Sequence, residues 1–218
     1  MRDDQLDMAR LSPLGAGDAM FTQRSVRRLR PDPIPMDDLR LIIEAAVHAP
    51  NGGNTQPTRF VLVTDRTRLD ALGTLYREAW WAKRRDSTGW KTIDDIPEGE
   101  KVARAAARFA DDIRNVPAMV LAFGDARMPA GLDALSVVPA AQNLMLAARA
   151  LGIGSLPTTL HPDVMERLYA LLKVPTRAQF HLLVPLGYPV SETAFGLTRR
   201  RPTNETTYLD EWGASVPW

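Results

Sequence analysis

Residues 49–60 concentrate the side chains best suited to recognising a small polar molecule. Three amide side chains and two glycines lie between two prolines, in the order Pro50, Asn51, Gly52, Gly53, Asn54, Gln56 and Pro57. Amides both donate and accept hydrogen bonds, so this set suits a flat heterocycle with alternating donors and acceptors better than it suits a bare phosphate. The same composition is typical of an Asn-Gly turn between a helix and a strand, and this segment alone leaves both interpretations open.

Two arginine clusters lie toward the two ends of the chain. The first is Arg-Ser-Val-Arg-Arg-Leu-Arg at 24–30, and the second is the triplet at 199–201. The first cluster is either a solvated surface patch, a nucleic-acid patch, or an anion clamp in which Ser25 and the guanidinium groups hold a phosphate. No aromatic residue interleaves with these arginines and the formal net charge is only +1, so nucleic acid is disfavoured.

A glycine-containing turn is expected at 152–159, Gly-Ile-Gly-Ser-Leu-Pro-Thr-Thr. It is not a dinucleotide-binding fingerprint, because that motif runs from strand through glycines into a helix, whereas here a helical pattern precedes the glycines. Gly152 is suited to ending that helix. We expect a short strand or turn whose backbone can approach a ligand.

Other chemistries lack the residues they need. The sequence has no cysteine, and its three histidines, His48, His161 and His181, are far apart and form no zinc-binding pattern. No Gly-x-Ser-x-Gly or Walker motif occurs. No secretory signal is recognisable and no apolar run approaches the ~20 residues of a membrane helix, so we expect a cytoplasmic protein that binds no membrane.

The length of 218 residues and the apolar content of 45% fit a single domain with a full core. Apolar residues at helical spacing predict helices at 15–23, 36–48, 66–81, 98–114, 133–151 and 161–172. Strand-like runs occupy 59–64, 116–123 and 179–187. In the last run, strict alternation puts Phe180, Leu182 and Val184 on one face and Leu183 and Pro185 on the other.

Three segments fall outside this pattern. Residues 1–13 are expected to be a loose arm, and residues 82–97, which are polar and basic, a mobile surface excursion. The tail at 199–218 contains Tyr208, Trp212 and Trp218, which make it too apolar for a free tail in water. We expect the tail to wrap a second subunit. The helix at 133–151, apolar on several sides, is expected at the domain centre or in a subunit interface.

Taken in order, these pieces resemble the FMN-dependent nitroreductase family. The resemblance extends from about residue 22 to 202 and rests on five stretches, at 23–35, 49–57, 140–157, 186–189 and 199–202. It implies an α+β fold of three layers, with a mainly antiparallel central sheet flanked by helices and a C-terminal arm around the partner subunit. It also implies a homodimer in which each FMN lies at the subunit interface.

The resemblance further implies the roles of individual residues. Arg24 and Ser25, with Arg199 and Arg201, match the phosphate clamp. Arg27 stands where the family places a cation beside the flavin N1 and O2 atoms, which gain negative charge on reduction. The flavin-contacting loop, contributed by the other subunit, corresponds to Pro50, Asn51, Gly52, Asn54 and Gln56. Pro157, Thr158 and Thr159 match the turn over the ring whose backbone amide meets N5.

Two classes of function follow from this resemblance. In the first, the protein is an oxidoreductase that uses NAD(P)H and FMN to reduce a nitroaromatic, a quinone or an activated alkene in alternating, ping-pong steps. In the second, it is a flavin-binding or storage protein with little turnover, or a relative that degrades flavin or removes halogen. The first class requires no catalytic acid or base from the protein, because the flavin does the chemistry. The absence of metal-ligand spacing among the histidines predicts no metal site.

Overall fold

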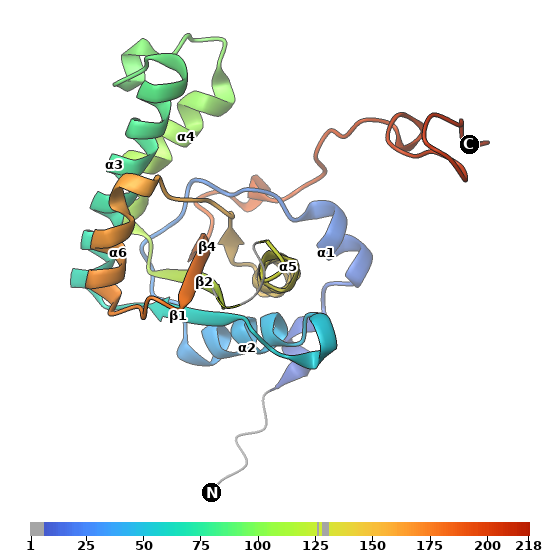
Figure 1. Cartoon of the computed structure of the whole chain (residues 1–218), viewed down its shortest axis with the longest axis horizontal. Helices are drawn as coiled ribbons and strands as arrows, with labels where there is room; N and C mark the ends of the chain where they lie inside the picture. Colours follow the sequence, from blue (N-terminus) through green and yellow to red (C-terminus); the bar gives the residue numbers. More distant parts are fainter. Residues whose placement is uncertain (1–6, 126, 128–130) are drawn as a thin grey trace, which may run out of the picture.

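A four-stranded antiparallel sheet forms the middle of three layers (Figure 1). The structure is a computed structural model that describes residues 7–125, 127 and 131–218. The strands are β1 (Arg59–Val63), β2 (Ala118–Asp125), β3 (Gly154–Ser155) and β4 (Ala178–Gly187), in the order β1-β2-β4-β3. Helices α2 (Met36–Val47) and α5 (Ala134–Ala150) cover one face. Helices α3 (Arg66–Thr88), α4 (Lys101–Asp112) and α6 (Met165–Leu172) cover the other, which confirms the expected α+β fold.

Strand β2 lies at the centre of the core, because helices cover the sheet on both sides. Its side chains alternate between the two apolar clusters: Met119 and Leu121 pack beneath α3, α4 and α6, whereas Val120 and Ala122 pack beneath α2 and α5. Burial on both faces explains why this strand is read from the sequence as a continuous apolar run.

The faces of β4 differ from the strict alternation that the sequence predicts. Phe180 packs with Leu183 in the cluster beneath α3 and α6, whereas Leu182 packs in the opposite cluster. The cause is a register shift between Ala122 and Phe123, whose partners are Leu182 and Phe180, so that β4 contains one extra residue. Such a bulge reverses the facing of every residue on one side of it.

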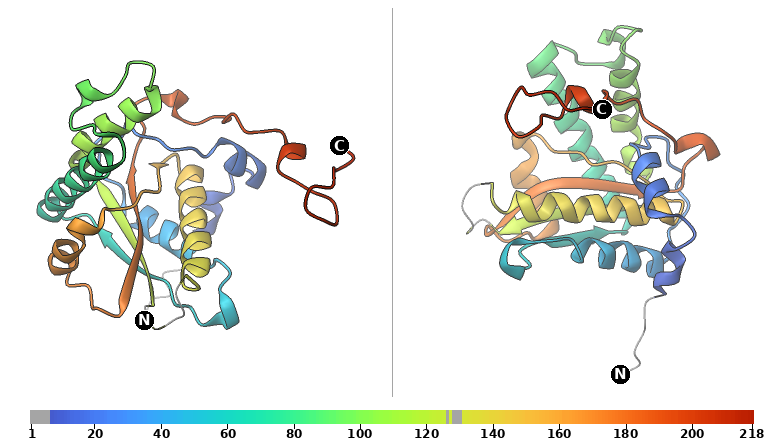
Figure 2. Two further views of the ribbon diagram at one scale, coloured as in Figure 1. Left: turned by 45° about the horizontal axis from the view of Figure 1, so that its top comes forward. Right: turned by 90° about the vertical axis from the view of Figure 1, so that its right-hand side faces the viewer.

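The helix predicted at 66–81 is longer than expected and includes the first part of the surface excursion predicted at 82–97. Helix α3 continues to Thr88, and Gly89, with φ of 78°, ends it by donating its amide to the Arg85 carbonyl. After the short 3-10 helix η3 (Ile93–Asp95) the chain returns along α4, so the segment is the tip of a helical hairpin (Figures 1 and 2). The last turn of α3 is exposed on all sides, which is why it shows no apolar periodicity.

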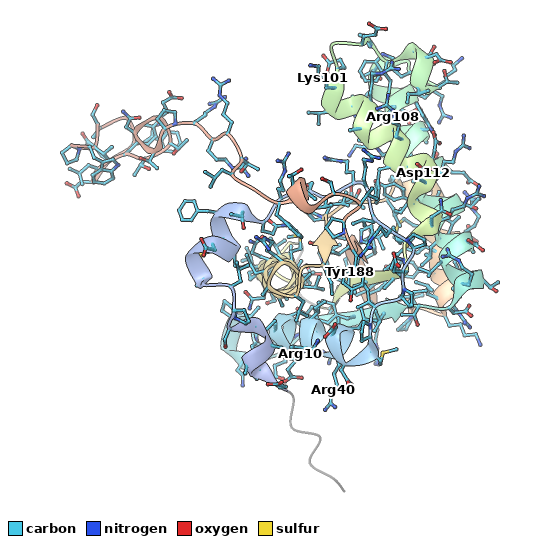
Figure 3. The ribbon with its side chains drawn as sticks, turned by 180° about the vertical axis from the view of Figure 1, so that it is seen from behind. Arg10, Arg40, Lys101, Arg108, Asp112 and Tyr188 are labelled. Carbon is cyan, nitrogen blue, oxygen red and sulfur yellow. The ribbon has the colours of Figure 1, made fainter. Side chains whose placement is uncertain are left out.

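Charged side chains lie along α4, the second helix of this hairpin. Lys101, Arg108 and Asp112 lie along α4 from the tip toward the body, as Figure 3 shows, and all three are exposed. On the inner side Arg104 donates hydrogen bonds to the Ile93 and Ile96 carbonyls, the latter at 2.5 Å. These bonds hold the connecting loop against α4.

The expected loose arm at 1–13 is ordered over its later part. Met8–Leu11 forms the 3-10 helix η1, and Arg10 makes an ion pair with Asp38, a buried carboxylate of α2. The first half of that prediction lies outside the described residues. The other predicted elements are present with ends shifted by a few residues, including α1 (Ala16–Thr22).

The C-terminal tail leaves the body of the molecule. After the 3-10 helix η6 (Glu192–Ala194) it runs outward through η7 (Thr203–Glu205) and folds back on itself at its end, as Figure 1 and the left view of Figure 2 show. Within this end Tyr208 and Trp212 stack with ring centroids 4.8 Å apart, and Tyr208 pairs with Ser215. The tail therefore has a local structure of its own while touching little of its own domain.

Candidate functional site

The first arginine cluster lies directly on strand β3. The Val26 amide donates to the Ser155 carbonyl at 3.1 Å, and Ser25 and Ser155 form a parallel bridge. Gly154 makes this approach possible, because a Cβ there would lie 2.8 Å from the Leu29 side chain and 2.9 Å from Val26. The structure thus brings two of the predicted stretches together, the arginine cluster and the glycine-containing turn.

The turn at 157–159 is fixed to β4 just beyond this contact. The Thr158 amide donates to the Leu183 carbonyl at 2.9 Å, and the Leu183 amide donates to the Thr158 carbonyl at 2.8 Å. Thr158 is half-buried, whereas Pro157 and Thr159 are exposed. Because its own amide is used by Leu183, Thr158 offers a ligand its side chain, while the exposed neighbours leave the backbone of the turn accessible.

Tyr76, a residue of α3, connects the hairpin layer to this turn. Its hydroxyl lies 3.1 Å from Thr158 Oγ1, and only 3% of the residue is exposed. Burial raises the pKa of the Tyr76 phenol above its usual 10.0, although the Thr158 hydrogen bond and the charges of Arg27 and Arg84 act in the opposite direction. The hydroxyl is therefore protonated near neutral pH and joins the helix to the turn.

Sequence reasoning assigned no site role to Tyr76 or Arg84. Apolar spacing in the sequence places Tyr76 on the packing face of the helix at 66–81, and Arg84 falls in the stretch at 82–97 that is predicted to be a mobile surface excursion. The signal that could have identified them is the four-residue spacing of Tyr76, Trp80 and Arg84, which continues one face of α3 up to its C-terminal turn.

The arginines of the predicted clamp are free to bind an anion. Arg24 is exposed and Arg27 is half-buried. The predicted site contains four arginines, and none of them has a carboxylate partner in the described part of the chain. They are Arg24, Arg27, Arg199 and Arg201. Guanidinium and hydroxyl donors without a competing carboxylate fit a phosphate ester. The donor set around Ser25 is therefore compatible with a phosphorylated cofactor such as FMN.

The tail passes the arginine cluster before it leaves the body. The Gly196 amide donates to the Thr22 carbonyl at 3.1 Å, and Arg149 stacks on the Phe195 ring at 4.1 Å. Arg199 and Arg201 follow within five residues and are exposed on the outgoing segment (Figure 1).

The amide-rich loop is held by its own side chains. Asn51 accepts a hydrogen bond from the Gln56 amide at 2.8 Å, and Asn54 and Gln56 adopt φ of 53° and 49°. Left-handed conformations at non-glycine residues carry a cost that local hydrogen bonds can offset. Gly52 begins a 3-10 turn (Gly52–Asn54), and Pro50 precedes it. The loop does form the helix-to-strand connection that its composition also suggests.

This loop and the arginine cluster lie at opposite ends of α5. Asn51 and Gln56 line a cavity of about 110 Å³ together with Ser136 and Ala140, in the first turns of that helix. Ser155, the partner of Val26, follows the C-terminal end of the helix. At 1.5 Å per residue the two ends of α5 are about 24 Å apart. Within one chain, the structure does not bring the loop to the arginines.

Two other kinds of site find no support in the described residues. They contain no group of three or more histidine or acidic side chains placed to hold a metal ion. Nor does any helix in the described part of the chain have the length and apolar character needed to cross a bilayer.

Comparisons with known proteins agree with the expected family. A family model described as the nitroreductase family matches residues 21–188. The chain is 32% identical to an NADH dehydrogenase of Thermus thermophilus over 84% of this chain and 91% of that protein. It is 29% identical to an iodotyrosine deiodinase of Thermotoga neapolitana, over 77% and 84% of the two chains.

A solved structure gives the same result for the fold. The FMN-dependent nitroreductase NfnB of Mycobacterium smegmatis, in complex with NADPH, superposes with a TM-score of 0.68 at 25% identity, over 94% of this chain and all of that one. The extent of the family match, together with the identity to the Thermus protein, is decisive. The chain belongs to the nitroreductase family of oxidoreductases.

Proposed function

We propose that the protein is an FMN-dependent oxidoreductase that takes reducing equivalents from NAD(P)H and delivers them to a small organic acceptor in alternating steps. The proposed acceptors are nitroaromatics, quinones and activated alkenes. The observation that carries the proposal is the contact of Ser25 and Val26, next to Arg27, with Ser155 on β3, beside the turn whose Thr158 hydrogen-bonds Tyr76. It supplies a cation, hydroxyl groups and an open backbone turn at one place.

The chain's own residues supply binding and orientation. Arg24 and Ser25, with Arg199 and Arg201 from a tail, would hold the phosphate. Arg27 would lie at the pyrimidine edge of the ring, and Pro157, Thr158 and Thr159 at its N5 edge. When bound, FMN supplies the hydride chemistry itself. A fixed guanidinium such as Arg27 stabilises negative charge that develops beside it, and the half-buried position strengthens that effect.

We propose further that the site is completed by a second copy of the chain. Pro50, Asn51, Gly52, Asn54 and Gln56 lie too far from Arg27 of their own chain to share a ligand with it. Leu135 and Val138 of α5 are 68% and 56% exposed, beside the loop's end of that helix. An exposed apolar helix face next to a polar loop is typical of an interface between subunits.

A second candidate function is reductive removal of halogen from an aromatic substrate. The identity to an iodotyrosine deiodinase supports it. The same flavin and the same cationic site would serve that reaction, so the two functions differ in the acceptor and not in the cofactor.

The test is an absorbance spectrum of the purified protein followed by anaerobic addition of NADPH. We expect flavin absorbance that NADPH bleaches and that a nitroaromatic or a quinone restores. A protein that stays colourless with excess FMN would contradict the proposal. Restoration by a halogenated phenol, but by no nitroaromatic or quinone, would favour the second candidate.

A further inference from the structure

We propose that Arg84 recognises a carboxylate on the electron acceptor, so that the preferred acceptors are aromatic acids that carry their reducible group on the same ring. This inference rests on the proposed function and adds to it the chemical class of the acceptor. It assigns to the end of α3 a role in specificity, in a segment for which the sequence predicts only a mobile surface excursion.

Helix α3 directs Arg84 toward the candidate site. Tyr76, Trp80 and Arg84 are spaced four residues apart, so they share one face of the helix. Side chains on a helix point back toward its N-terminus, which here is the direction of Tyr76 and Thr158. The Arg84 guanidinium carbon lies 5.0 Å from the centre of the Trp80 ring, in a cation–π contact that holds the side chain along this face.

Arg84 has no anionic partner in the described part of the chain. Its Nε atom is buried and makes no hydrogen bond there. Its neighbours on the helix differ: Arg77 pairs with Asp111 at 2.6 Å, and Arg85 pairs with Asp86 at 3.2 Å. Arg84 as a whole residue is only half-buried, so a ligand can reach its side chain, and a carboxylate there would supply the counter-charge that the described residues do not.

The two free cations occupy different positions at this site. Arg27 comes from the segment that rests on β3, where the proposed flavin would lie. Arg84 comes from the hairpin, two helical turns beyond Tyr76, and therefore lies farther along α3 from the Thr158 turn than Tyr76 does. An acceptor that reaches the ring from the hairpin side meets Arg84 with its distal group while its reducible group points inward.

The chemistry around Arg84 selects the class of ligand. A guanidinium forms two parallel hydrogen bonds with a carboxylate, which a neutral amide cannot reproduce. Trp80 is itself buried beneath the guanidinium, so it fixes the cation and does not contact the ligand. The aromatic ring comes from the nitroaromatic acceptors of the proposed function, and a carboxylate on that ring would meet Arg84.

The experiment compares para-nitrobenzoate with para-nitrobenzamide, which has nearly the same shape and no charge. For the FMN-loaded protein we expect kcat/KM to favour the carboxylate. In Arg84→Met we expect that ratio to fall at least tenfold, mainly through a higher KM for nitrobenzoate, and in Arg84→Lys to fall less. Arg85→Met, whose arginine is already paired, is the matched control and should keep the ratio.

A binding measurement gives a readout independent of turnover. Benzoate should perturb the flavin absorbance of the oxidised protein at lower concentration than benzamide does, and Arg84→Met should weaken benzoate binding at least tenfold. The comparison of benzoate with benzamide on the unmodified protein tests the inference even if Arg84→Met does not fold.

The outcomes of these experiments distinguish a failure of the proposed role of Arg84 from a failure of the proposed function. A protein that neither binds FMN nor is reduced by NADPH overturns the proposed function. A flavoprotein that reduces both nitro compounds equally, with the same ratio in Arg84→Met, overturns only the role of Arg84. An unchanged ratio with a raised KM for NADPH also overturns it, because the anion would then be a phosphate of the co-substrate.

Discussion

The Tyr76 hydroxyl lies 3.1 Å from Thr158 Oγ1, and this contact joins two layers of the molecule. Tyr76 belongs to the helical hairpin, whereas Thr158 belongs to a turn fixed to the sheet through Leu183. The same hydroxyl senses the charges of Arg27 and Arg84. A buried hydrogen bond between a helix of one layer and a turn fixed to the sheet is well placed to hold a binding site in one geometry.

Replacing Tyr76 by phenylalanine should change how stability depends on pH. Burial raises the pKa of Tyr76 above 10.0, so at high pH the unfolded chain loses this proton before the folded protein does. Stability therefore falls as the pH rises above about 10, the usual tyrosine pKa. Tyr76→Phe should remove that part of the fall, while near neutral pH it should lose about 0.5–1.5 kcal/mol with the hydrogen bond to Thr158.

Urea unfolding between neutral and alkaline pH measures both effects of Tyr76→Phe. Tyr208→Phe is a suitable control, because Tyr208 is exposed on the tail. An alkaline loss of stability that is equal in the unmodified protein and Tyr76→Phe would show that Tyr76 does not cause it.

Arg27→Met should leave FMN bound but make its reduction slower. Methionine keeps much of the apolar stem and removes the charge that would act on the reduced cofactor, so the loss is larger for the reduced state than for the oxidised one. We expect reduction by NADPH to slow by about tenfold to a hundredfold. This is no more than the rate loss caused by removing one oxyanion-hole donor, because Arg27 is only half-buried. Stopped-flow absorbance and the flavin midpoint potential measure this. Arg28→Met, at an exposed neighbour, is the control, and an unchanged potential in Arg27→Met would mean that Arg27 points elsewhere.

Gly73→Ala should destabilise the fold without touching the site. A Cβ at Gly73 would lie 2.5 Å from the Arg114 Cβ and 2.7 Å from its Cα, and Arg114 belongs to the 3-10 helix η4 (Ile113–Asn115). Backbone at such a distance must move, and overpacking of this kind costs about 1–3 kcal/mol. Gly17→Ala is the control, since nothing lies within 4 Å of a Cβ there and alanine favours a helix. Equal thermal midpoints for both variants would contradict the close contact between α3 and η4.

The local sequence pattern predicts most of the helices and strands, whereas it predicts the candidate site only as separate stretches. Apolar spacing gives α2 and α5 because each has one continuous buried stripe. It fails for Phe180, since a bulge depends on the partner strand, and for the end of α3, which has no buried face. The separate stretches around Ser25 and Thr158 carry their chemistry in the sequence. Their meeting with Tyr76 and Arg84 depends on how the hairpin packs against the sheet, which local pattern does not encode.

Removing the tail after Pro202 should weaken a dimer and the retention of flavin together. Trp212 and Trp218 are 90% and 67% exposed in a single chain. This is a large apolar surface for a segment whose contacts with the described part of its own domain lie near Phe195. Burying such side chains contributes about 1.5–3 kcal/mol each, so a partner surface is the economical explanation for them. The shortened chain should keep β4, which ends at Gly187, and should lose the dimer at protein concentrations where the full chain retains it.

Sedimentation velocity at micromolar concentration tests whether the flavin site is formed by one chain or by a dimer. The flavin content is measured on each species. Full-length protein should sediment as a flavin-loaded dimer, and the chain ending at Pro202 as a mixture shifted toward monomer with less flavin. Trp212→Ser, which alters the tail without shortening it, should give an intermediate result, whereas Val102→Ser, at an apolar residue exposed on α4, should match the full chain. A full-length monomer that retains FMN would assign the loop at 50–56 to a role in its own chain, because no partner would then be present to use it.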